Sequence, residues 1–311
     1  MRDDAKAAFL QHTGWDTAHQ IPLKADASAR RYYRLVSQTN TILMDADPKR
    51  GEDTEQFVRV AEFLRRSGLR VPQIFEADHQ HGFLIIEDFG DTLLSDRISQ
   101  RPDQKQDLYR EVIDVLIALG RCDVPDWIAP SNIDSLTRMV DPAFEYFVND
   151  EEQKRAIRTC LSDILSTPLE ATQTVSLRDV HAENIMILDD RGGLGSFGLL
   201  DFQDAFACHP AYDVMSLLQD VRRLFDPQFE AEMMRYFQAH SARDGFEDGY
   251  FALGFLRNFR ILGRFQELAD LGKTEYVKFT PRVVQILRHN LDHTSLAPMR
   301  PLIDPILREL A

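Results

Sequence analysis

The sequence predicts an α+β protein with two lobes: a small, β-rich N-terminal lobe over residues 1–88 and a larger, mainly helical lobe over residues 89–311. Three observations support this prediction. A length of 311 residues exceeds the usual size of a single hydrophobic core. The first third contains short β-prone runs, whereas apolar residues recur at helical spacing after residue 102. Between these regions Phe89-Gly90 interrupts both patterns, which marks the expected linker.

The N-terminal lobe is expected to contain antiparallel strands packed against one helix. Two β-prone runs flank the polar turn Gln38-Thr39-Asn40, as in a hairpin. An amphipathic helix should begin at the capping residue Asp53 and end at Gly68. The expected strands cover residues 31–37 and 41–45, followed by a strand pair from Ile74 to Asp88.

The C-terminal lobe is expected to be helical. Residues 102–120 place Leu108, Val112 and Leu119 on one face, which is typical of an amphipathic helix. Further helices are expected at residues 151–166, 211–223, 228–240, 246–270, 281–291 and 301–310.

Composition narrows the class of protein. A net charge of −14 argues against nucleic acid as a partner. No apolar run is long enough to span a membrane, and the N-terminal residues lack the pattern of a signal peptide. Cys122, Cys160 and Cys208 are widely spaced and odd in number, which is typical of reduced thiols. We therefore expect a cytoplasmic protein; its expected assembly is a monomer or weak dimer.

One motif carries chemistry. Asp179 follows Arg178, Asn184 lies five positions later, and Asp201-Phe202 follows a second apolar run. A kinase needs a carboxylate to accept a proton from the acceptor hydroxyl, and an Asn and a second Asp to hold Mg²⁺. If residues 184–188 and 197–201 pair around Gly192-Gly193, Asn184 lies opposite Asp201. Each residue alone could be an ordinary turn or surface residue, but together they predict a phosphoryl-transfer site.

The order of lobes and the motif resemble the aminoglycoside phosphotransferase family, which has the protein-kinase-like fold. The likeness covers nearly the whole chain. Within the family it points to the anomeric sugar kinases that phosphorylate N-acetylmuramate and N-acetylglucosamine in bacterial cell-wall recycling. The passages that carry it are residues 26–34, 44–48 and 200–205, Tyr212-Asp213 and residues 261–265.

The resemblance implies roles for individual residues. Asp179 looks like the catalytic base, and Asn184 and Asp201 look like ligands of Mg²⁺ that binds with ATP. Asp213 resembles the family Asp that braces the catalytic loop. Arg178 and His181 are expected to brace this loop without touching substrate, Arg178 through an ion pair and His181 through a hydrogen bond. The adenine is expected against the backbone of Ile86, Glu87, Asp88 and Phe89.

The sequence departs from the family pattern at two places. Leu177 stands where these kinases usually have His, so polar support of the loop comes from elsewhere or is replaced by apolar packing. The third strand has no Lys to contact the nucleotide phosphates. Arg30 is the best replacement by position, because it follows the turn expected at residues 26–29. Either Glu55 or Glu62 could be the acidic partner in the helix.

The acceptor is less well defined by the sequence. Arg257, Arg260 and Arg264 form a stripe that is either a solvated helix face or a site for an acceptor carboxylate. Asp204 and His209 could meet sugar hydroxyls. Besides a sugar 1-kinase, the alternatives are an aminoglycoside phosphotransferase, a choline or homoserine type of kinase, and a nucleotide-binding module without turnover. GTP in place of ATP also remains open.

Overall fold

The structure is a computed structural model that describes residues 2–23, 29–37, 40–188, 192–241 and 245–310. The chain folds as two compact units. The first unit, the sheet unit, comprises Met1–Pro102 and Glu183–Gln203, and the second, the helical unit, comprises Asp103–Ala182 and Asp204–Ala311. The predicted α+β class is confirmed, because an antiparallel sheet forms the first unit and helices dominate the second. The lobe boundary after residue 88 stays a prediction.

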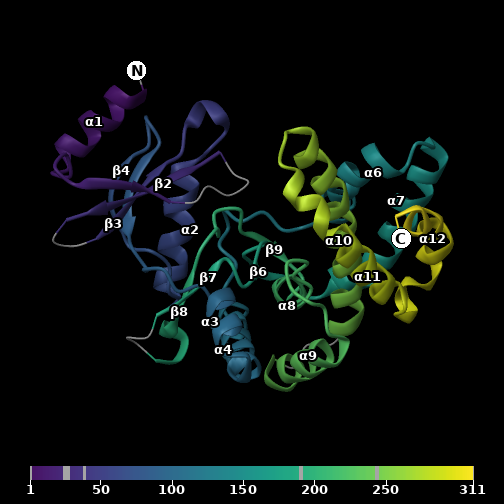
Figure 1. Cartoon of the computed structure of the whole chain (residues 1–311). Helices are drawn as coiled ribbons and strands as arrows, with labels where there is room; N and C mark the ends of the chain where they lie inside the picture. Colours follow the sequence, from purple (N-terminus) through teal and green to yellow (C-terminus); the bar gives the residue numbers. More distant parts are fainter. Residues whose placement is uncertain (1, 24–28, 38–39, 189–191, 242–244, 311) are drawn as a thin grey trace. The chain divides into compact units, whose positions relative to one another are not determined.

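The sheet unit is built on five antiparallel strands in the order β1-β2-β3-β5-β4 (Figure 1). The strands are β1 His19–Pro22, β2 Arg31–Val36, β3 Thr41–Asp45, β4 Ile74–Asp78 and β5 Phe83–Glu87. All but β1 were predicted; β1 has only four residues and no apolar alternation. The turn expected at residues 38–40 lies, apart from Asn40, outside the described residues. The same holds for the turn at 26–29, apart from Ala29.

One helix covers each face of this sheet, because alternate strand residues point to opposite sides. Phe9 of α1 (Arg2–His12) packs with Leu43 and Phe83 on one face. Helix α1 is also held by an ion pair between Arg2 and Asp45 of β3. Helix α2 (Thr54–Arg66) lies on the other face (Figure 1), and it begins as predicted, with Asp53 accepting a hydrogen bond from the Gln56 N–H.

A short hairpin completes the sheet unit, together with α3 (Leu94–Gln100). Its strands are β7 (Ile185–Ile187) and β8 (Phe197–Leu199). The predicted register was wrong by one residue, since Ile185 pairs with Leu199, which sets Asn184 opposite Leu200 and not Asp201. The cause is the connection: a 3₁₀ turn at Gly193–Ser196 replaces the expected two-residue turn. Residues 189–191 of this connection lie outside the described residues.

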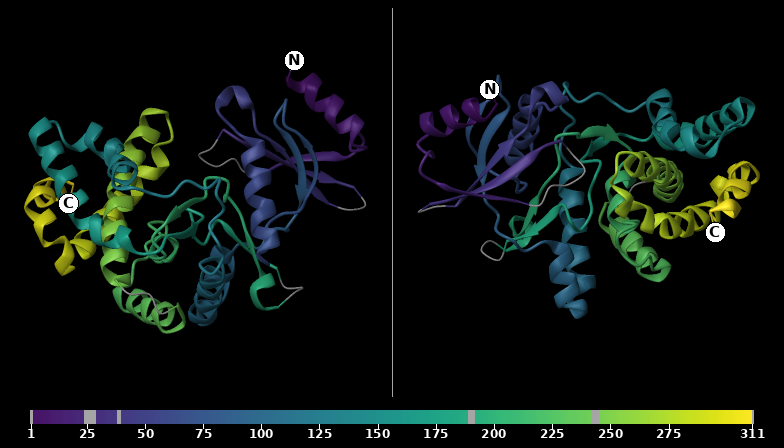
Figure 2. Two further views of the ribbon diagram at one scale, coloured as in Figure 1. Left: turned by 180° about the vertical axis from the view of Figure 1, so that it is seen from behind. Right: turned by 45° about the horizontal axis from the view of Figure 1, so that its top comes forward.

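In the helical unit, other helices pack around one long helix, α10 (Phe246–Asp270), which is yellow-green in Figures 1 and 2. Helices α6, α8 and α11 pack directly on it. At the α6 contact, a Cβ on Gly263 would lie 2.2 Å from the backbone of Pro142, so only Gly allows this approach. The other helices are α4 Lys105–Leu119, α5 Ile133–Thr137, α6 Asp141–Phe147, α7 Glu151–Glu170, α8 Ala211–Leu218, α9 Pro227–Ser241, α11 Thr280–Leu291 and α12 Arg300–Glu309.

Each helix predicted for the C-terminal region is present; α10 has the predicted ends, and the ends of the other helices differ from the prediction. Helix α8 stops at Leu218 and not at residue 223, whereas α7 continues to Glu170. The helical unit also contains a strand pair that was not predicted, β6 (Thr174–Ser176) with β9 (Phe206–Cys208). This pair flanks the loop that carries Asp179.

Among the described residues, no helix is both long and apolar enough to cross a membrane. Further 3₁₀ turns lie at Pro48–Arg50, Pro102–Gln104, Arg138–Val140, Thr274–Phe279 and Thr294–Met299.

Candidate active site

The sheet unit contains a pocket of about 370 Å³ between its sheet, α2 and the β7–β8 hairpin. This volume is within the range usual for small-molecule sites. Its apolar walls come from Ile42, Ile86, Met186 and Leu200. Polar groups gather at the same pocket, since Arg30, Asn184 and Asp201 line it as well. An apolar slot with a charged end suits a ligand with a flat base and an anionic tail.

The segment expected to contact adenine does line this pocket, as Ile86, Glu87, Asp88 and Phe89 all border it. Its two carboxylates are held by arginines. Arg70 Nη1 donates to Glu87 Oε2 at 2.7 Å, and Arg34 Nε lies 2.6 Å from Asp88 Oδ2. These pairs neutralise both acidic side chains and fix the segment's conformation.

Asn184 and Asp201 meet despite the shifted register. Asn184 Nδ2 lies 3.5 Å from Asp201 Oδ2, and the Leu200 N–H donates to the Asn184 carbonyl at 2.9 Å. The cause is the backbone of Asp201, which has φ = 56° in the left-handed region. Such a φ is uncommon for a residue with a Cβ, and it turns the side chain out of the strand direction. The two predicted metal ligands are therefore adjacent, by a route that the sequence did not indicate.

Arg30 is buried and bridges two carboxylates. Its Nη2 lies 2.8 Å from Asp201 Oδ1, and its Nε lies 3.3 Å from Glu52 Oε2. Burial by itself would lower the pKa of Arg30. The electrostatic effects of Tyr32, Asp201 and Glu52 together are larger, so the pKa is raised. Among the described residues, Arg30 Nη1 has no hydrogen-bond partner. A buried, charged group with an unused donor at a pocket suits an anionic ligand.

The acidic partner of Arg30 is a residue that the sequence did not indicate. It is Glu52, which precedes α2, and neither helix residue serves. Glu55 is exposed, and Glu62 pairs with Arg66 on the same exposed helix surface. The sequence suggested candidates only within the helix. In the structure Arg30 lies beside the loop that leads into α2, and Glu52 belongs to this loop.

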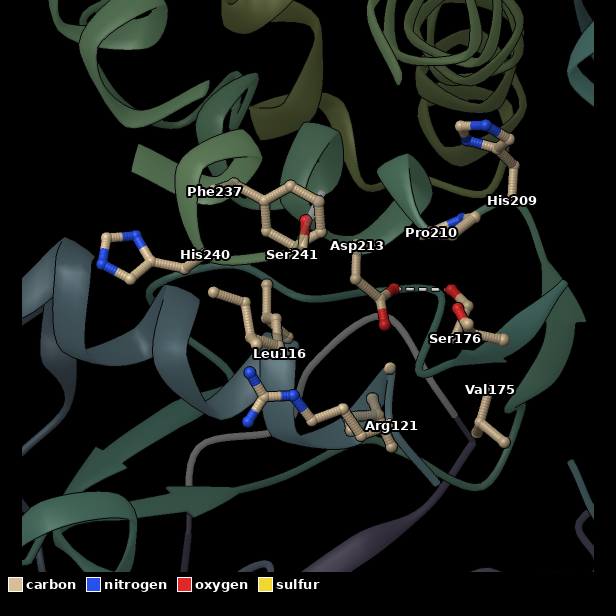
Figure 3. Close-up of a pocket in the computed structure, with 14 residues that line it drawn as sticks. Leu116, Arg121, Val175, Ser176, His209, Pro210, Asp213, Phe237, His240 and Ser241 are labelled. Carbon is tan, nitrogen blue, oxygen red and sulfur yellow. Dashed lines mark hydrogen bonds between the residues drawn. The ribbon is translucent and has the colours of Figure 1, made fainter. Parts of the chain in front are cut away.

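In the helical unit, Asp213 of α8 holds the loop that carries Asp179. It accepts a hydrogen bond from Ser176 Oγ at 2.6 Å (Figure 3), and further hydrogen bonds from the Leu177 N–H at 2.7 Å and the Arg178 N–H at 3.1 Å. Burial raises the pKa of Asp213 to about 6, although these three hydrogen bonds act in the opposite direction. Asp213 also borders a small cavity of about 110 Å³ (Figure 3). The geometry matches the bracing position expected for this residue.

The loop itself combines strain with burial. Arg178 has φ = 76°, a second left-handed residue beside a candidate catalytic group. Its guanidinium lies 6.0 Å from the centre of the Phe206 ring, a contact that differs from the expected ion pair. Leu177 is 3% exposed, so apolar packing stands where the family's His would be. His181 is also buried. Its burial is the main reason that its pKa lies well below 6.5, and the positive charges of Arg222 and Arg257 add to this effect. The imidazole is therefore neutral at pH 7.

The arginines of α10 do not form one solvated stripe. Arg257 is 4% exposed, and its Nη2 lies 3.2 Å from Asp179 Oδ1. Arg260 is partly buried, and burial and the neighbouring Arg178 lower its pKa. Arg264 pairs instead with Glu267 one turn along the helix. The structure therefore brings Arg257 to the candidate base and leaves Arg264 in a local surface pair.

The two suggested contacts with sugar hydroxyls differ in exposure. His209 is 1% exposed, its Nδ1 accepts from the Ala211 N–H at 3.2 Å, and a Cβ on Gly249 would lie 2.4 Å from its ring. These contacts make His209 part of the packing between α8 and α10. Asp204 is exposed and follows the hairpin. A direct role for either residue in acceptor binding stays a prediction.

The sequence of the chain is similar to those of known enzymes. Residues 19–248 match the family model described as "Phosphotransferase enzyme family". The N-acetylmuramate/N-acetylglucosamine kinase of Caulobacter vibrioides is 32% identical, with 97% of this chain and 96% of that protein covered. The enzyme of the same name from Pseudomonas aeruginosa is 29% identical, with 88% and 85% covered.

Solved structures support the fold at much lower identity. A choline/ethanolamine kinase family protein from Mesorhizobium loti has a TM-score of 0.67 at 11% identity and covers 97% of this chain and 99% of its own. The ADP-bound aminoglycoside phosphotransferase APH(2'')-Ib has a TM-score of 0.61 at 13% identity, with 98% and 96% covered. The protein-kinase-like fold and the family resemblance predicted from the sequence are thereby confirmed. This chain is a member of the phosphotransferase enzyme family, an ATP-dependent phosphotransferase that acts on a small molecule.

Proposed function

We propose that this protein is a kinase that transfers the γ-phosphoryl group of ATP to the anomeric hydroxyl of an N-acetylated amino sugar, N-acetylmuramate or N-acetylglucosamine. The observation that carries the proposal is the 32% identity over nearly the full length of both chains to an enzyme named for these two sugars. The choline kinase and aminoglycoside phosphotransferase neighbours are 11–13% identical, a level that speaks for the fold alone. We therefore do not extend their acceptors to this protein.

ATP is proposed to bind in the pocket of the sheet unit. The apolar walls suit the adenine ring, with the backbone at Glu87 and Asp88 offering hydrogen bonds to its edge. Arg30 would take the place of the missing strand Lys and contact the phosphates, since its buried guanidinium borders the pocket and retains an unused donor within the described residues.

The residues beside Arg30 fit Mg²⁺. An Asn amide oxygen and an Asp carboxylate are hard donors, and the side chains of Asn184 and Asp201 are adjacent at this pocket, with the amide nitrogen Nδ2 3.5 Å from Asp201 Oδ2. The described residues contain no group of three or more His, Cys, Asp and Glu side chains that would form a complete protein cage. Mg²⁺ bound by Asn184 and Asp201 would take the rest of its ligands from water and phosphate. Bound there, the ion would neutralise charge on the phosphates.

Asp179 is proposed as the base. In the reaction the anomeric oxygen attacks the γ-phosphorus, its proton passes to a carboxylate oxygen of Asp179, and the bond to the β,γ-bridging oxygen breaks to release ADP. An anomeric hydroxyl is more acidic than an ordinary alcohol, so a single carboxylate suffices. The hydrogen bonds from the loop backbone to Asp213 hold Asp179 in place for this step.

The location and assembly of the protein are also proposals. Cys122, Cys160 and Cys208 are all free thiols, which agrees with a reducing cytoplasm. We further propose a monomer or weak dimer without nucleic acid as a partner, since the net charge of −14 disfavours a phosphate backbone.

A screen of ATP consumption tests the proposed function. Purified protein with Mg²⁺ would be offered N-acetylmuramate, N-acetylglucosamine, choline, homoserine and kanamycin. We expect turnover with one or both sugars at rates well above those of the other acceptors. Efficient turnover of kanamycin or choline without sugar turnover would replace this proposal, and nucleotide binding without any turnover would favour the non-catalytic alternative.

A further inference from the structure

The helical unit carries a local excess of positive charge around Asp179, although the whole chain has a net charge of −14. Arg257 is in direct contact with Asp179. The pKa of Arg260 is lowered mainly by burial, and the charges of Arg178 and Arg257 lower it further. Burial is likewise the main cause of the lowered pKa of His181, and the charges of Arg222 and Arg257 lower it further. The arginine contributions to both shifts show that several positive charges lie close to Asp179.

Arg257 is the centre of this region. It is 4% exposed, whereas the Asp179 side chain is 37% exposed, so the carboxylate is accessible and the guanidinium lies beneath it. The contact between them, at 3.2 Å, uses one nitrogen. Among the described residues, Arg257 Nε has no hydrogen-bond partner. Because a guanidinium can bind a carboxylate through two parallel hydrogen bonds, Arg257 has capacity for a second or different anion.

Tyr212 provides a second donor in the same place. Its hydroxyl is buried and has no hydrogen-bond partner within the described part of the chain. Its ring lies 5.0 Å from the ring of Phe206, which the Arg178 guanidinium also approaches, and burial raises the pKa of Tyr212 to about 12, so the hydroxyl stays protonated. A buried hydroxyl without a partner costs free energy unless a ligand supplies an acceptor.

We propose that the carboxylate of an acidic amino sugar replaces Asp179 on Arg257, with the Tyr212 hydroxyl as a second donor, and thereby releases Asp179 to act as the base. This inference rests on the proposed function and names its acceptor: the sugar that carries a carboxylate. The exchange is balanced, because one guanidinium gives up one carboxylate for another and no proton or covalent bond moves. A neutral sugar cannot replace Asp179, so Arg257 continues to hold the base.

The test compares kcat/KM for N-acetylmuramate with that for its carboxamide, an uncharged analogue of nearly equal size. Wild type should prefer the acid by roughly 10- to 100-fold, the range for loss of a charge-assisted hydrogen bond. Arg257→Ala should erase this preference, and Arg257→Gln, which retains most of the buried side chain, should do the same if the alanine variant folds poorly. Tyr212→Phe should reduce the preference without removing it. Arg264→Ala should keep it, since Arg264 pairs with Glu267.

The ratio of the kcat/KM values for two substrates does not change when part of the protein is unfolded. It therefore separates an effect on substrate recognition from an effect on stability. Release of the base predicts one more result: the ratio of N-acetylglucosamine turnover to N-acetylmuramate turnover should rise in Arg257→Gln relative to wild type. An unchanged acid preference in both Arg257 variants, with sugars still phosphorylated, would overturn this inference alone. Absence of sugar turnover by wild type would overturn the proposed function and this inference with it.

Discussion

Arg30 Nη2 and Asp201 Oδ1 are 2.8 Å apart, so the residue before β2 and the second residue after β8 form a direct ion pair at the pocket of the sheet unit. The same Asp201 lies beside Asn184 through its other oxygen, Oδ2. One carboxylate therefore connects the proposed phosphate-binding cation with the proposed metal ligands. A change to Arg30 should act on nucleotide binding, and a change to Asp201 should act on both nucleotide and metal.

Arg30→Ala should raise the KM for ATP by roughly 10- to 100-fold, because a charge-assisted contact with the phosphates is lost. Arg34→Ala is the comparison variant and should raise the KM for ATP less. Arg34 borders the same pocket, but Asp88 and Asp91 already engage its guanidinium. Steady-state kinetics with varied ATP measures both variants, and an equal effect of the two changes would refute the assignment of Arg30.

Asp201→Ala and Asp179→Ala should separate metal binding from proton transfer. Loss of Asp201 should abolish turnover and the Mg²⁺ dependence of ATP binding. Loss of Asp179 should lower kcat by roughly 10²–10⁴-fold and leave ATP binding nearly intact, since a base acts on the acceptor. Calorimetric titration with ATP and Mg²⁺ distinguishes them, and equal loss of nucleotide binding in both variants would contradict the assigned roles.

Asp213→Asn should change how stability depends on pH. The folded-state pKa of Asp213 is about 6, above the value of about 3.9 for an unfolded Asp. Between these values the folded chain keeps a proton that the unfolded chain has lost, so this residue's contribution to the free energy of unfolding falls as pH rises from about 4 to about 6 and is constant above. The change amounts to about 3 kcal/mol at most, at 1.36 kcal/mol per pKa unit.

Urea unfolding of wild type and Asp213→Asn at about pH 4.5 and about pH 7.5 measures this effect. The stability advantage of wild type over the variant should be larger at the lower pH. An advantage that is the same at both values would show that Asp213 keeps its ordinary pKa. The variant should also lose activity at neutral pH, because an Asn places an N–H₂ group among the N–H donors of the loop.

Gly263→Ala should destabilise the helical unit by about 1–3 kcal/mol, because the added methyl group would meet the backbone of Pro142, which cannot rotate away. Gly120→Ala is the control, since its Cβ would find no atom closer than 3.4 Å and its backbone is helical. Thermal unfolding should show a lower Tm for the first variant and little change for the second. A similar Tm for both would mean that α6 and α10 can separate without cost.

The sequence predicted most elements because local signals agreed with the fold. The capping residue Asp53 and the apolar spacing of α2 act within a few residues, and the structure reproduces both. Helix α1 was missed because its apolar residues are few, and its stability depends on contacts with distant residues, such as the pair of Arg2 with Asp45. Such long-range contacts have no local signature.

The candidate site shows the same limit. Asn184 and Asp201 were chosen by residue type and spacing, and the structure places them together although the predicted register was wrong. What joins them is the left-handed backbone of Asp201, which only the surrounding structure can impose. Glu52 and Tyr212 were not predicted as site residues, because their importance comes from packing against Arg30 and near Arg257.

The most direct test of the account is phosphorus NMR of the product formed from ATP and N-acetylmuramate, beside the same reaction with the methyl glycoside whose anomeric oxygen is blocked. The account predicts a sugar 1-phosphate, identified by coupling of its phosphorus to the anomeric proton, and no product from the glycoside. Phosphorylation of the glycoside, or coupling to a proton at another ring position, would contradict the anomeric kinase.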